Sequence, residues 1–287
     1  MRIIDQNADT FEKSGRNSSK AMVRHAEAAM IPVKCQSPTQ NRLIAALPSD
    51  VYERVRPNLA PVTLSLSEII YARGGRPECV YFPTEAVVSL LYTTEDGATA
   101  EVGMTGNDGI VGIALFLGGE TAPNRAIVQI AGGVFRMRAD VLQEEFARGG
   151  AFQKLLLRYT QSFLTQVSQT AVCNRLHPVE KRLCRWLLLC HDRVQADQLT
   201  MTQEFISNML GTRRESVTIA AARLQDAGLI HYSRGTITIL DRPGLESAGC
   251  ECYRTVRSEF DRLVGMRQPA ASEYGPWGAQ KARQQFR

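Results

Sequence analysis

The residue types best suited to chemistry gather in one short stretch, Gly211-Thr-Arg-Arg-Glu215, where two guanidinium groups and a carboxylate follow a tight-turn glycine. Thr212 and Glu215 have the spacing of a capping box, in which the threonine caps a helix and the glutamate reaches back to the cap. A helix of about eight residues from Thr202 precedes the glycine, and the second helix ends at Gly228. Two short helices joined by a glycine turn predict a helix-turn-helix, whose second helix enters the major groove of DNA.

The stretch after this second helix alternates between apolar and polar residues. Residues 229–240 have the pattern of two strands about the turn Arg234-Gly235, which predicts a β-hairpin wing. A helical hairpin that binds no ligand is the alternative. The capping box, the glycine turn, the paired arginines and the wing together favour a DNA-binding unit, which we place at residues 178–245.

The rest of the chain must position this unit. Its 287 residues suggest about two domains, and 44% hydrophobic residues are enough for cores, which excludes a wholly disordered chain. The longest apolar runs have five residues, against the ~18 that a membrane-spanning helix needs. The first residues carry no secretion signal, so we expect a cytoplasmic protein without a membrane partner. Residues 1–39 are polar and aperiodic, and we interpret them as a flexible arm.

Charge is unevenly distributed along the chain, whose net charge is +5. Residues 40–150 carry 9 basic and 13 acidic side chains, whereas residues 151–177 carry 3 basic and no acidic ones. An acidic front half is therefore joined to a basic back half. This asymmetry indicates a polyanionic partner for the back half.

Residues 40–150 have the pattern of a second domain. Short runs of strand-forming residues recur about ten residues apart between Pro61 and Arg138, and glycine turns such as Gly74-Gly75 and Gly118-Gly119 separate them. This spacing predicts an antiparallel barrel or roll. The expected fold class is α+β: an N-terminal antiparallel β-roll of the jelly-roll kind, a long helix and a C-terminal winged helix-turn-helix.

Residues 151–177 predict one long helix, because neither glycine nor proline interrupts them before Pro178. Apolar residues recur on it every three or four positions and form a seam that suits a partner helix. The seam consists of Phe152, Leu156, Tyr159, Phe163 and Val167. We expect this seam to join two copies of the chain as a homodimer; the alternative is a helix packed on its own domain. Residues 246–287 are interpreted as a C-terminal helix and tail.

Residues 40–245 resemble the Crp/Fnr family of bacterial transcription regulators, which includes the catabolite activator protein. The stretch 211–217 matches the family's Gly-x-x-Arg-Glu-Thr-Val at the start of its recognition helix. Arg73-Gly-Gly, Asp96-Gly97 and residues 106–116 follow the turns of the family's β-roll. The resemblance implies a homodimer that binds a palindromic double-stranded DNA operator, with RNA polymerase as a further partner and the β-roll as a sensor.

The resemblance also assigns roles to individual residues. Arg214 and Glu215 would read bases, because a guanidinium binds guanine O6 and N7 and a carboxylate accepts a hydrogen bond from cytosine N4. Contacts to backbone phosphates are assigned to Thr202, Arg213 and Ser216. Many members have a third base-reading arginine where this chain has Ile219. Thr218 or Ile219 is therefore expected to contact a thymine methyl group.

The β-roll lacks side chains that hold a cyclic nucleotide in other family members. In those members a Gly-Glu pair holds the ribose and an Arg-Ser pair holds the phosphate. The matching positions here are Gly112-Ile113 and Arg125-Ala126, so apolar residues replace the glutamate and the serine. Arg125 alone is interpreted as a surface charge. We expect no binding of cyclic AMP, and the sequence leaves the sensed signal open.

No cofactor or metal site is expected. An iron–sulfur cluster needs about four thiolates, and the N-terminal region offers only Cys35. Residues 40–150 contain no histidine, which leaves Cys79 and Met104 as haem ligands. Cys250-x-Cys252 is shorter than the usual zinc pair and lacks two further ligands nearby in the sequence. Its thiols are interpreted as structural, with redox sensing as the alternative.

Two other classes of protein contain a β-roll. A cupin-like metal enzyme needs histidine or glutamate ligands inside the barrel, but the four histidines lie at positions 25, 177, 191 and 231. A cyclic-nucleotide- or redox-responsive module of a kinase or channel would not carry a helix-turn-helix. Both alternatives are disfavoured, and we do not expect an enzyme.

Overall fold

The structure is a computed structural model, and it describes residues 37–265 except positions 96, 120 and 195. Nearly all of the predicted N-terminal arm, residues 1–39, lies outside the described residues, as does the tail after residue 265. Within the described part of the chain, no helix has the length and apolar character that a membrane crossing requires.

Four short helices open the described chain: η1 (Pro38–Gln40), α1 (Arg42–Ala45), α2 (Ser49–Val55) and η2 (Arg56–Asn58). Asn41 attaches them to the sheet region. Its Oδ1 accepts a hydrogen bond from the amide of Leu43 at 3.1 Å and so caps α1, while its Nδ2 donates to the carbonyls of Pro83 and Gly109, each at 2.8 Å. A single buried amide thus joins α1 to β3 and to the turn at Gly109.

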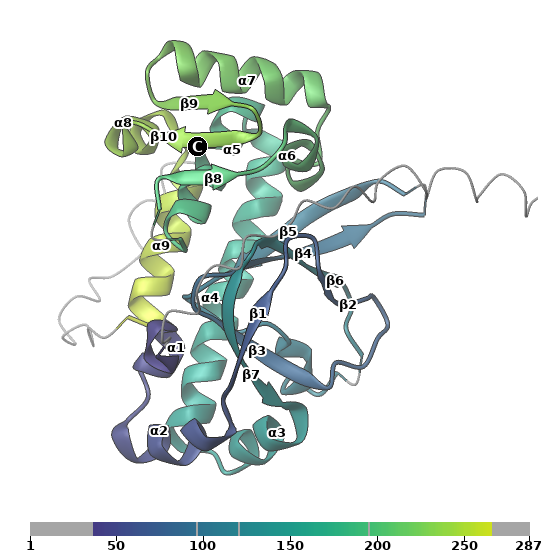
Figure 1. Ribbon diagram of the computed structural model, residues 1–287, viewed down its shortest axis with the longest axis vertical. Helices are drawn as coiled ribbons and strands as arrows, with labels where there is room; N and C mark the ends of the chain where they lie inside the picture. The colour runs from purple at the N-terminus through teal and green to yellow at the C-terminus, as the bar shows by residue number, and fades with distance from the viewer. Residues whose placement is uncertain (1–36, 96, 120, 195, 266–287) are drawn as a thin grey trace, which may run out of the picture. The chain divides into compact units, whose positions relative to one another are not determined.

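Seven antiparallel strands form the predicted β-roll (Figure 1). Their bounds are β1 (Ala60–Leu64), β2 (Ile69–Tyr71), β3 (Cys79–Pro83), β4 (Val87–Thr93), β5 (Thr99–Thr105), β6 (Arg125–Ile130) and β7 (Gly132–Arg138). One sheet has the order β1-β7-β3 and the other β2-β6-β4-β5. Apolar side chains fill the core, among them Val80, Phe82, Val88, Val128 and Val134. The antiparallel roll that the strand spacing predicted is confirmed.

Three helices follow the roll. They are α3 (Ala139–Ala147), α4 (Gly150–Leu176) and α5 (Val179–His191). The 27-residue helix α4 packs against α3, β5 and the last described helix, α9 (Glu251–Leu263). It ends at Leu176 with His177 as its C-cap, because Pro178 has no amide proton to donate and serves as the N-cap of α5 instead.

The DNA-binding unit comprises α5, α6 (Gln203–Leu210), α7 (Arg214–Asp226) and a small sheet. This sheet has the order β8-β10-β9, with bounds β8 (Gln198–Thr200), β9 (Ile230–Ser233) and β10 (Thr236–Ile239). The α+β fold, with its long helix and winged helix-turn-helix, is therefore confirmed. Helix α8 (Arg242–Ala248) packs on α5 and spans position 245, where we placed the end of this unit.

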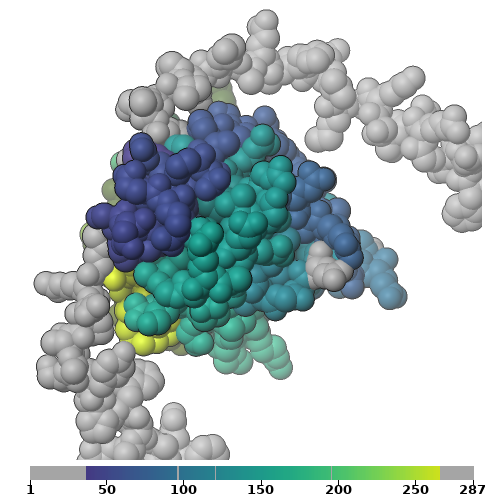
Figure 2. Space-filling view, turned by 90° about the horizontal axis from the view of Figure 1, so that it is seen from below, coloured from purple at the N-terminus to yellow at the C-terminus, as the bar shows by residue number. Residues whose placement is uncertain are grey.

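Helix α9 returns from the DNA-binding unit along α4 toward the start of the chain (Figure 1). Arg42 of α1 forms an ion pair of 3.0 Å with Asp261, and its guanidinium lies 4.5 Å from the centre of the Phe260 ring. Figure 2 shows the same arrangement from another side, with α9 in yellow beside the purple first helices and teal α4. The C-terminal extension is thus part of the packed protein.

Candidate nucleic-acid interface

Packing within the DNA-binding unit decides which face of α7 is exposed. Val217, Ala220, Ala221 and Leu224 recur every three or four residues on α7, and all four are buried. They pack against α5 and α6, in one core with Trp186. Because the apolar side of α7 covers its own protomer, its opposite side is left for a ligand.

The turn between α6 and α7 follows the prediction at Gly211 but differs from it at Thr212. Gly211 has a φ of 56°, a left-handed conformation that glycine adopts without a steric penalty. The amide of Thr212 donates to the carbonyl of Ser207 at 3.0 Å and completes a Schellman motif at the end of α6. Helix α7 therefore begins one residue later than predicted, with Arg213 as N-cap and Arg214 as its first residue. The predicted capping box is wrong, because the backbone of Thr212 ends α6 instead.

The predicted base-reading residues share the open side of α7. Arg213, Arg214 and Glu215 are exposed at its first turn, and Ser216 is half-buried. Ile219 follows Glu215 by four residues, so the two side chains lie on one face of the helix. The side chain of Ile219 is 56% exposed and adds an apolar surface to this face. The arrangement offers two guanidinium groups, a carboxylate and an apolar surface together.

Two of the predicted DNA contacts also hold the unit together. The Oγ1 of Thr218 lies 2.9 Å from Oε1 of Gln203 and donates to it, which joins α7 to the start of α6. The Oγ1 of Thr202 accepts a hydrogen bond from the amide of Phe205 at 3.1 Å and caps α6. Both threonines are exposed. The methyl group of Thr218 therefore remains available to a base. The second lone pair of the Thr202 hydroxyl remains available to a hydrogen-bond donor.

The wing is held beside the start of α6. Its turn residues Arg234 and Gly235 have φ values of 49° and 79°, the two positive values that a type I′ hairpin turn requires. The hydroxyl of Tyr232 donates to the carbonyl of Met201 at 3.1 Å and fixes the hairpin to the chain before α6. A groove of about 270 Å³ lies between wing and helices, and its lining is Thr202, Gln203, Arg214, Tyr232, Arg234 and Gly235.

The β-roll offers a cyclic nucleotide few polar partners. Gly112, which matches the glycine of the family's nucleotide site, has a φ of 106° and is the N-cap of the short helix η3 (Ile113–Leu115). Ile113 and Ala126 supply no polar side chain at the ribose and phosphate positions. Arg125 is half-buried rather than on the surface, and its Nε has no hydrogen-bond partner among the described residues. Arg125 is therefore the one polar side chain that these four positions offer to a cyclic nucleotide.

The predicted dimerisation seam lies against the protomer's own β-roll and α9. Phe152, Leu156, Tyr159 and Phe163 are buried in the main core, and Val167 packs beside them. Tyr159 also accepts or donates a hydrogen bond of 2.9 Å with the hydroxyl of Thr105 on β5. These are the contacts that the alternative, a helix packed on its own domain, called for. The opposite face of α4 carries the exposed apolar residues Leu157, Leu164, Val172 and Leu176.

Sequence reasoning missed a buried carboxylate between the roll and the DNA-binding unit. Glu101 of β5 accepts hydrogen bonds from Nε1 of Trp186 at 3.1 Å and from Oγ of Ser89 at 2.6 Å. Burial raises the pKa of Glu101 to about 7, against the opposing effect of the Ser89 hydrogen bond. In the sequence, the alternation of β5 alone could have indicated that Glu101 points inward.

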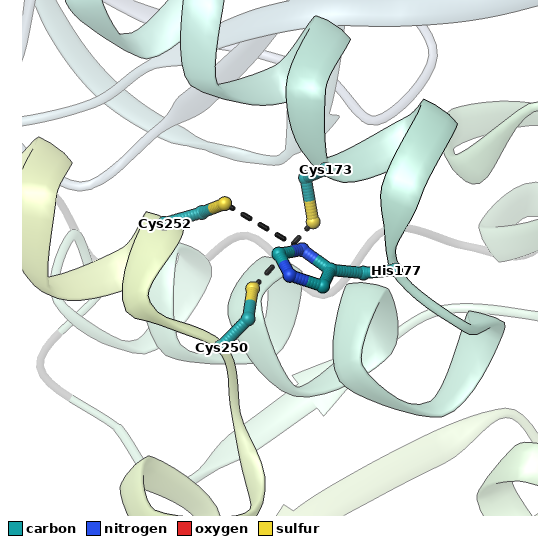
Figure 3. A group of neighbouring side chains, drawn as sticks. All are labelled: Cys173, His177, Cys250 and Cys252. Carbon is teal, nitrogen blue, oxygen red and sulfur yellow. Dashed lines mark hydrogen bonds between the residues drawn. The ribbon is translucent and has the colours of Figure 1, made fainter. Parts of the chain in front are cut away.

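The structure also contradicts the reason for expecting no metal site. Cys173 and His177 lie one turn apart at the end of α4, and the fold brings them to Cys250 and Cys252 (Figure 3). The two ligands that the C-x-C pair lacked in the sequence are thus supplied by a helix some 75 residues earlier. The Sγ atoms of Cys173 and Cys250 lie 3.6 Å apart, and the hydrogen bond between them lowers the pKa of the Cys250 thiol.

Two family models match this chain, one in the β-roll and one in the DNA-binding unit. The family model of the cyclic nucleotide-binding domain matches residues 61–148, and that of the Crp-like helix-turn-helix domain matches residues 181–248. No curated protein matches.

Solved structures share the fold. FixK2 from Bradyrhizobium japonicum is 18% identical, over 67% of this chain and 98% of its own, with a TM-score of 0.58. The c-di-GMP responsive global regulator CLP of Xanthomonas campestris is 18% identical, over 68% and 100%, with a TM-score of 0.54. A transcriptional regulator of the CRP family from Thermus thermophilus is 20% identical, over 65% and 95%, with a TM-score of 0.55.

A β-roll of the cyclic nucleotide-binding type, a long helix and a winged helix-turn-helix together define a two-domain DNA-binding regulator. The chain belongs to the Crp/Fnr family of transcription regulators, as the resemblance of residues 211–217 predicted. This family consists of regulators rather than enzymes.

Proposed function

We propose that this regulator binds a palindromic DNA operator as a homodimer, with one α7 helix in each of two major grooves. The observation that carries this proposal is the open side of α7, where Arg214, Glu215 and Ile219 are all exposed within the first two turns. Arg214 supplies a bidentate donor for guanine, Glu215 an acceptor for the cytosine amine, and Ile219 an apolar surface for a thymine methyl group. Arg213 at the N-cap is directed to the phosphate backbone.

Phosphate contacts are supported by the groove between the wing and α6. Thr202 caps the N-terminus of α6, whose unpaired amides favour an anion. Arg234 at the tip of the wing and Arg214 flank the same groove with positive charge. A DNA backbone passing there would meet two guanidinium groups, and binding would weaken as salt rises.

The dimer contact is assigned to the exposed face of α4 in place of the buried seam. Leu157 and Leu164 are seven residues apart, and Val172 and Leu176 continue the stripe toward the DNA-binding unit. A stripe of this period suits a parallel pair of helices, as in a coiled coil. Two-fold symmetry of the protein then matches a palindromic site.

The β-roll would act as a sensor without cyclic AMP, because its ribose and phosphate positions are apolar at Ile113 and Ala126. RNA polymerase is the further partner that a transcription regulator requires, and the cytoplasm is the compartment where DNA and polymerase meet in bacteria. Both follow from family membership alone.

A selection of binding sites from random DNA tests the proposal, with sedimentation of the selected complexes. We expect an inverted repeat with half-sites one helical turn apart, occupied by two protomers. Failure to enrich any sequence, or enrichment of a single half-site bound by one protomer, would contradict it.

A further inference from the structure

Four potential metal ligands meet where the DNA-binding unit joins α4. Cys173 lies in the last turn of α4, and His177 is the C-cap residue of this helix, with its amide donating a hydrogen bond to the carbonyl of Cys173. Cys250 is the N-cap of α9, and Cys252 lies in its first turn. Figure 3 shows the four side chains directed toward one another from these two elements. Three sulfurs and one imidazole nitrogen lie within 4.8 Å of one another.

The distances between these atoms are those of ligands around one ion. The Sγ atoms of Cys173 and Cys250 are 3.6 Å apart, and Nδ1 of His177 lies 3.6 Å from Sγ of Cys252. Zinc binds sulfur at ~2.3 Å and nitrogen at ~2.0 Å in a tetrahedron, which requires edges of roughly 3.5–3.8 Å. Each ligand of a four-iron cluster binds a different iron, so its ligands would stand farther apart than these.

His177 also has the outer partner that a metal-binding histidine needs. Its Nε2 lies 3.5 Å from a carboxylate oxygen of Glu251, on the side of the ring away from Cys252. A proton on Nε2 donated to Glu251 leaves the lone pair of Nδ1 free to face the thiols. Carboxylates commonly orient a metal-bound histidine in this way.

Two buried arginines of α5 lie near the cluster. Arg182 and Arg185 of α5 are buried, their Nε atoms have no hydrogen-bond partner among the described residues, and neither forms an ion pair with a described carboxylate. Both lie within electrostatic range of Cys173. A zinc ion with three thiolates and a neutral histidine has a net charge of −1, which would offset part of this buried positive charge.

We propose that Cys173, His177, Cys250 and Cys252 bind one zinc ion in a closed tetrahedral site. The ligands are soft, the three thiols are buried, and four protein ligands leave no open position, as in zinc sites that stabilise structure. Any of the three thiols that is protonated releases its proton when the ion binds.

The site would fasten α9 to the junction between α4 and α5. His177 is the last residue before Pro178, so the ion would sit at the point where the dimer helix passes into the DNA-binding unit. Zinc would therefore fix the direction in which α7 is presented. This consequence rests on the proposed DNA-binding function, whereas the metal site itself does not.

The first test is the metal content of the full chain, purified with a thiol reductant and without chelator. We expect about one zinc per chain by elemental analysis. Replacing the zinc with Co²⁺ should give the intense visible bands of tetrahedral cobalt and a near-ultraviolet band from thiolate. Zinc added to the stripped chain should raise its Tm by about 5–15 °C. Absence of metal after titration with Zn²⁺, iron with labile sulfide, or a Cys173–Cys250 disulfide in the reduced preparation would each overturn the proposal.

Variants locate the site and guard against misfolding. Cys252→Ser and His177→Ala should lose stoichiometric zinc and the cobalt spectrum, whereas His177→Cys, which keeps four soft ligands, should retain zinc. Cys79→Ser, a half-buried cysteine on β3 away from the cluster, should behave as the wild type. Zinc retained by both Cys252→Ser and His177→Ala would overturn the assignment. Zinc binding without operator binding would support the metal site and refute the proposed function. Operator binding without zinc binding would refute the metal site and support the proposed function.

Discussion

The indole Nε1 of Trp186 lies 3.1 Å from Oε1 of Glu101 and donates a hydrogen bond to it, which joins α5 of the DNA-binding unit to a buried carboxylate of the β-roll. Glu101 is only 5% exposed, and Ser89 holds its other oxygen. Gln129 and Cys190 continue the buried network, with Gln129 Nε2 at 2.9 Å from the Cys190 sulfur. The two domains therefore share a polar contact inside a mostly apolar interface.

Glu101 should make stability depend on pH. Its pKa is raised from 4.5 to about 7, so the folded state binds a proton more tightly than the unfolded state. The stabilising contribution of Glu101 is full below pH 4.5, falls as pH rises toward 7 and is lost above it, a total of about 3 kcal/mol from this group. Urea unfolding of wild type and Glu101→Gln between pH 5 and 8 checks this. The variant should lose most of the slope, and an unchanged slope would exclude Glu101 as its source.

The exposed face of α4 should control the oligomeric state. Leu157→Glu with Leu164→Glu places charges on that face and should give folded monomers with much weaker operator binding, measured by sedimentation and a DNA shift assay. Leu66→Glu with Leu117→Glu, at exposed apolar sites of the β-roll, is the control and should remain dimeric. Dimers of the α4 variant would show that another surface joins the protomers.

Substituting the buried seam instead would not be a clean test of dimerisation. Tyr159 and Phe163 are 3% and 6% exposed and pack on the roll. Glutamate at either position would bury an unpaired charge. We expect Phe163→Glu to lower Tm strongly, whatever the oligomeric state.

The two neighbouring arginines of α7 should have different effects on DNA binding. Arg214→Ala should cost about 1–3 kcal/mol at the cognate operator and relax the preference at one base pair of each half-site. Arg213→Ala should weaken binding to all sequences alike and reduce the salt slope by about one per protomer. Arg223→Ala, near the far end of the same helix, is the control. A selection of binding sites with each variant at two salt concentrations checks these roles. If Arg213→Ala altered the selected motif and Arg214→Ala left it intact, the two roles would be reversed.

Cyclic AMP should have no effect on the wild type. With Ile113 and Ala126 at the ribose and phosphate positions, calorimetric titration should show no heat of binding, and Tm and operator affinity should stay constant. Ile113→Glu with Ala126→Ser restores a polar group at each position and should introduce measurable binding beside Arg125. Micromolar binding by the wild type would contradict the interpretation.

Features that depend on neighbours along the chain were predictable from the residues alone. The seven strands, the end of α4 at Pro178 and the turn at Gly211 all follow from periodicity and from the backbone limits of proline and glycine. The motif at residues 211–217 likewise identified the recognition helix, because its residues are consecutive and lie at the start of one helix.

Tertiary structure decided what depends on distant partners. Helix α4 is apolar on two faces, and only packing on the roll and α9 shows that the Tyr159 face is buried and the Leu164 face exposed. Thr212 fits a cap by type and spacing, but its amide completes the end of α6. Cys173 and Cys250 are 77 residues apart and meet because α9 folds back along α4. Residue spacing reports contacts within one element, whereas contacts between elements depend on how whole helices and sheets bury their apolar faces.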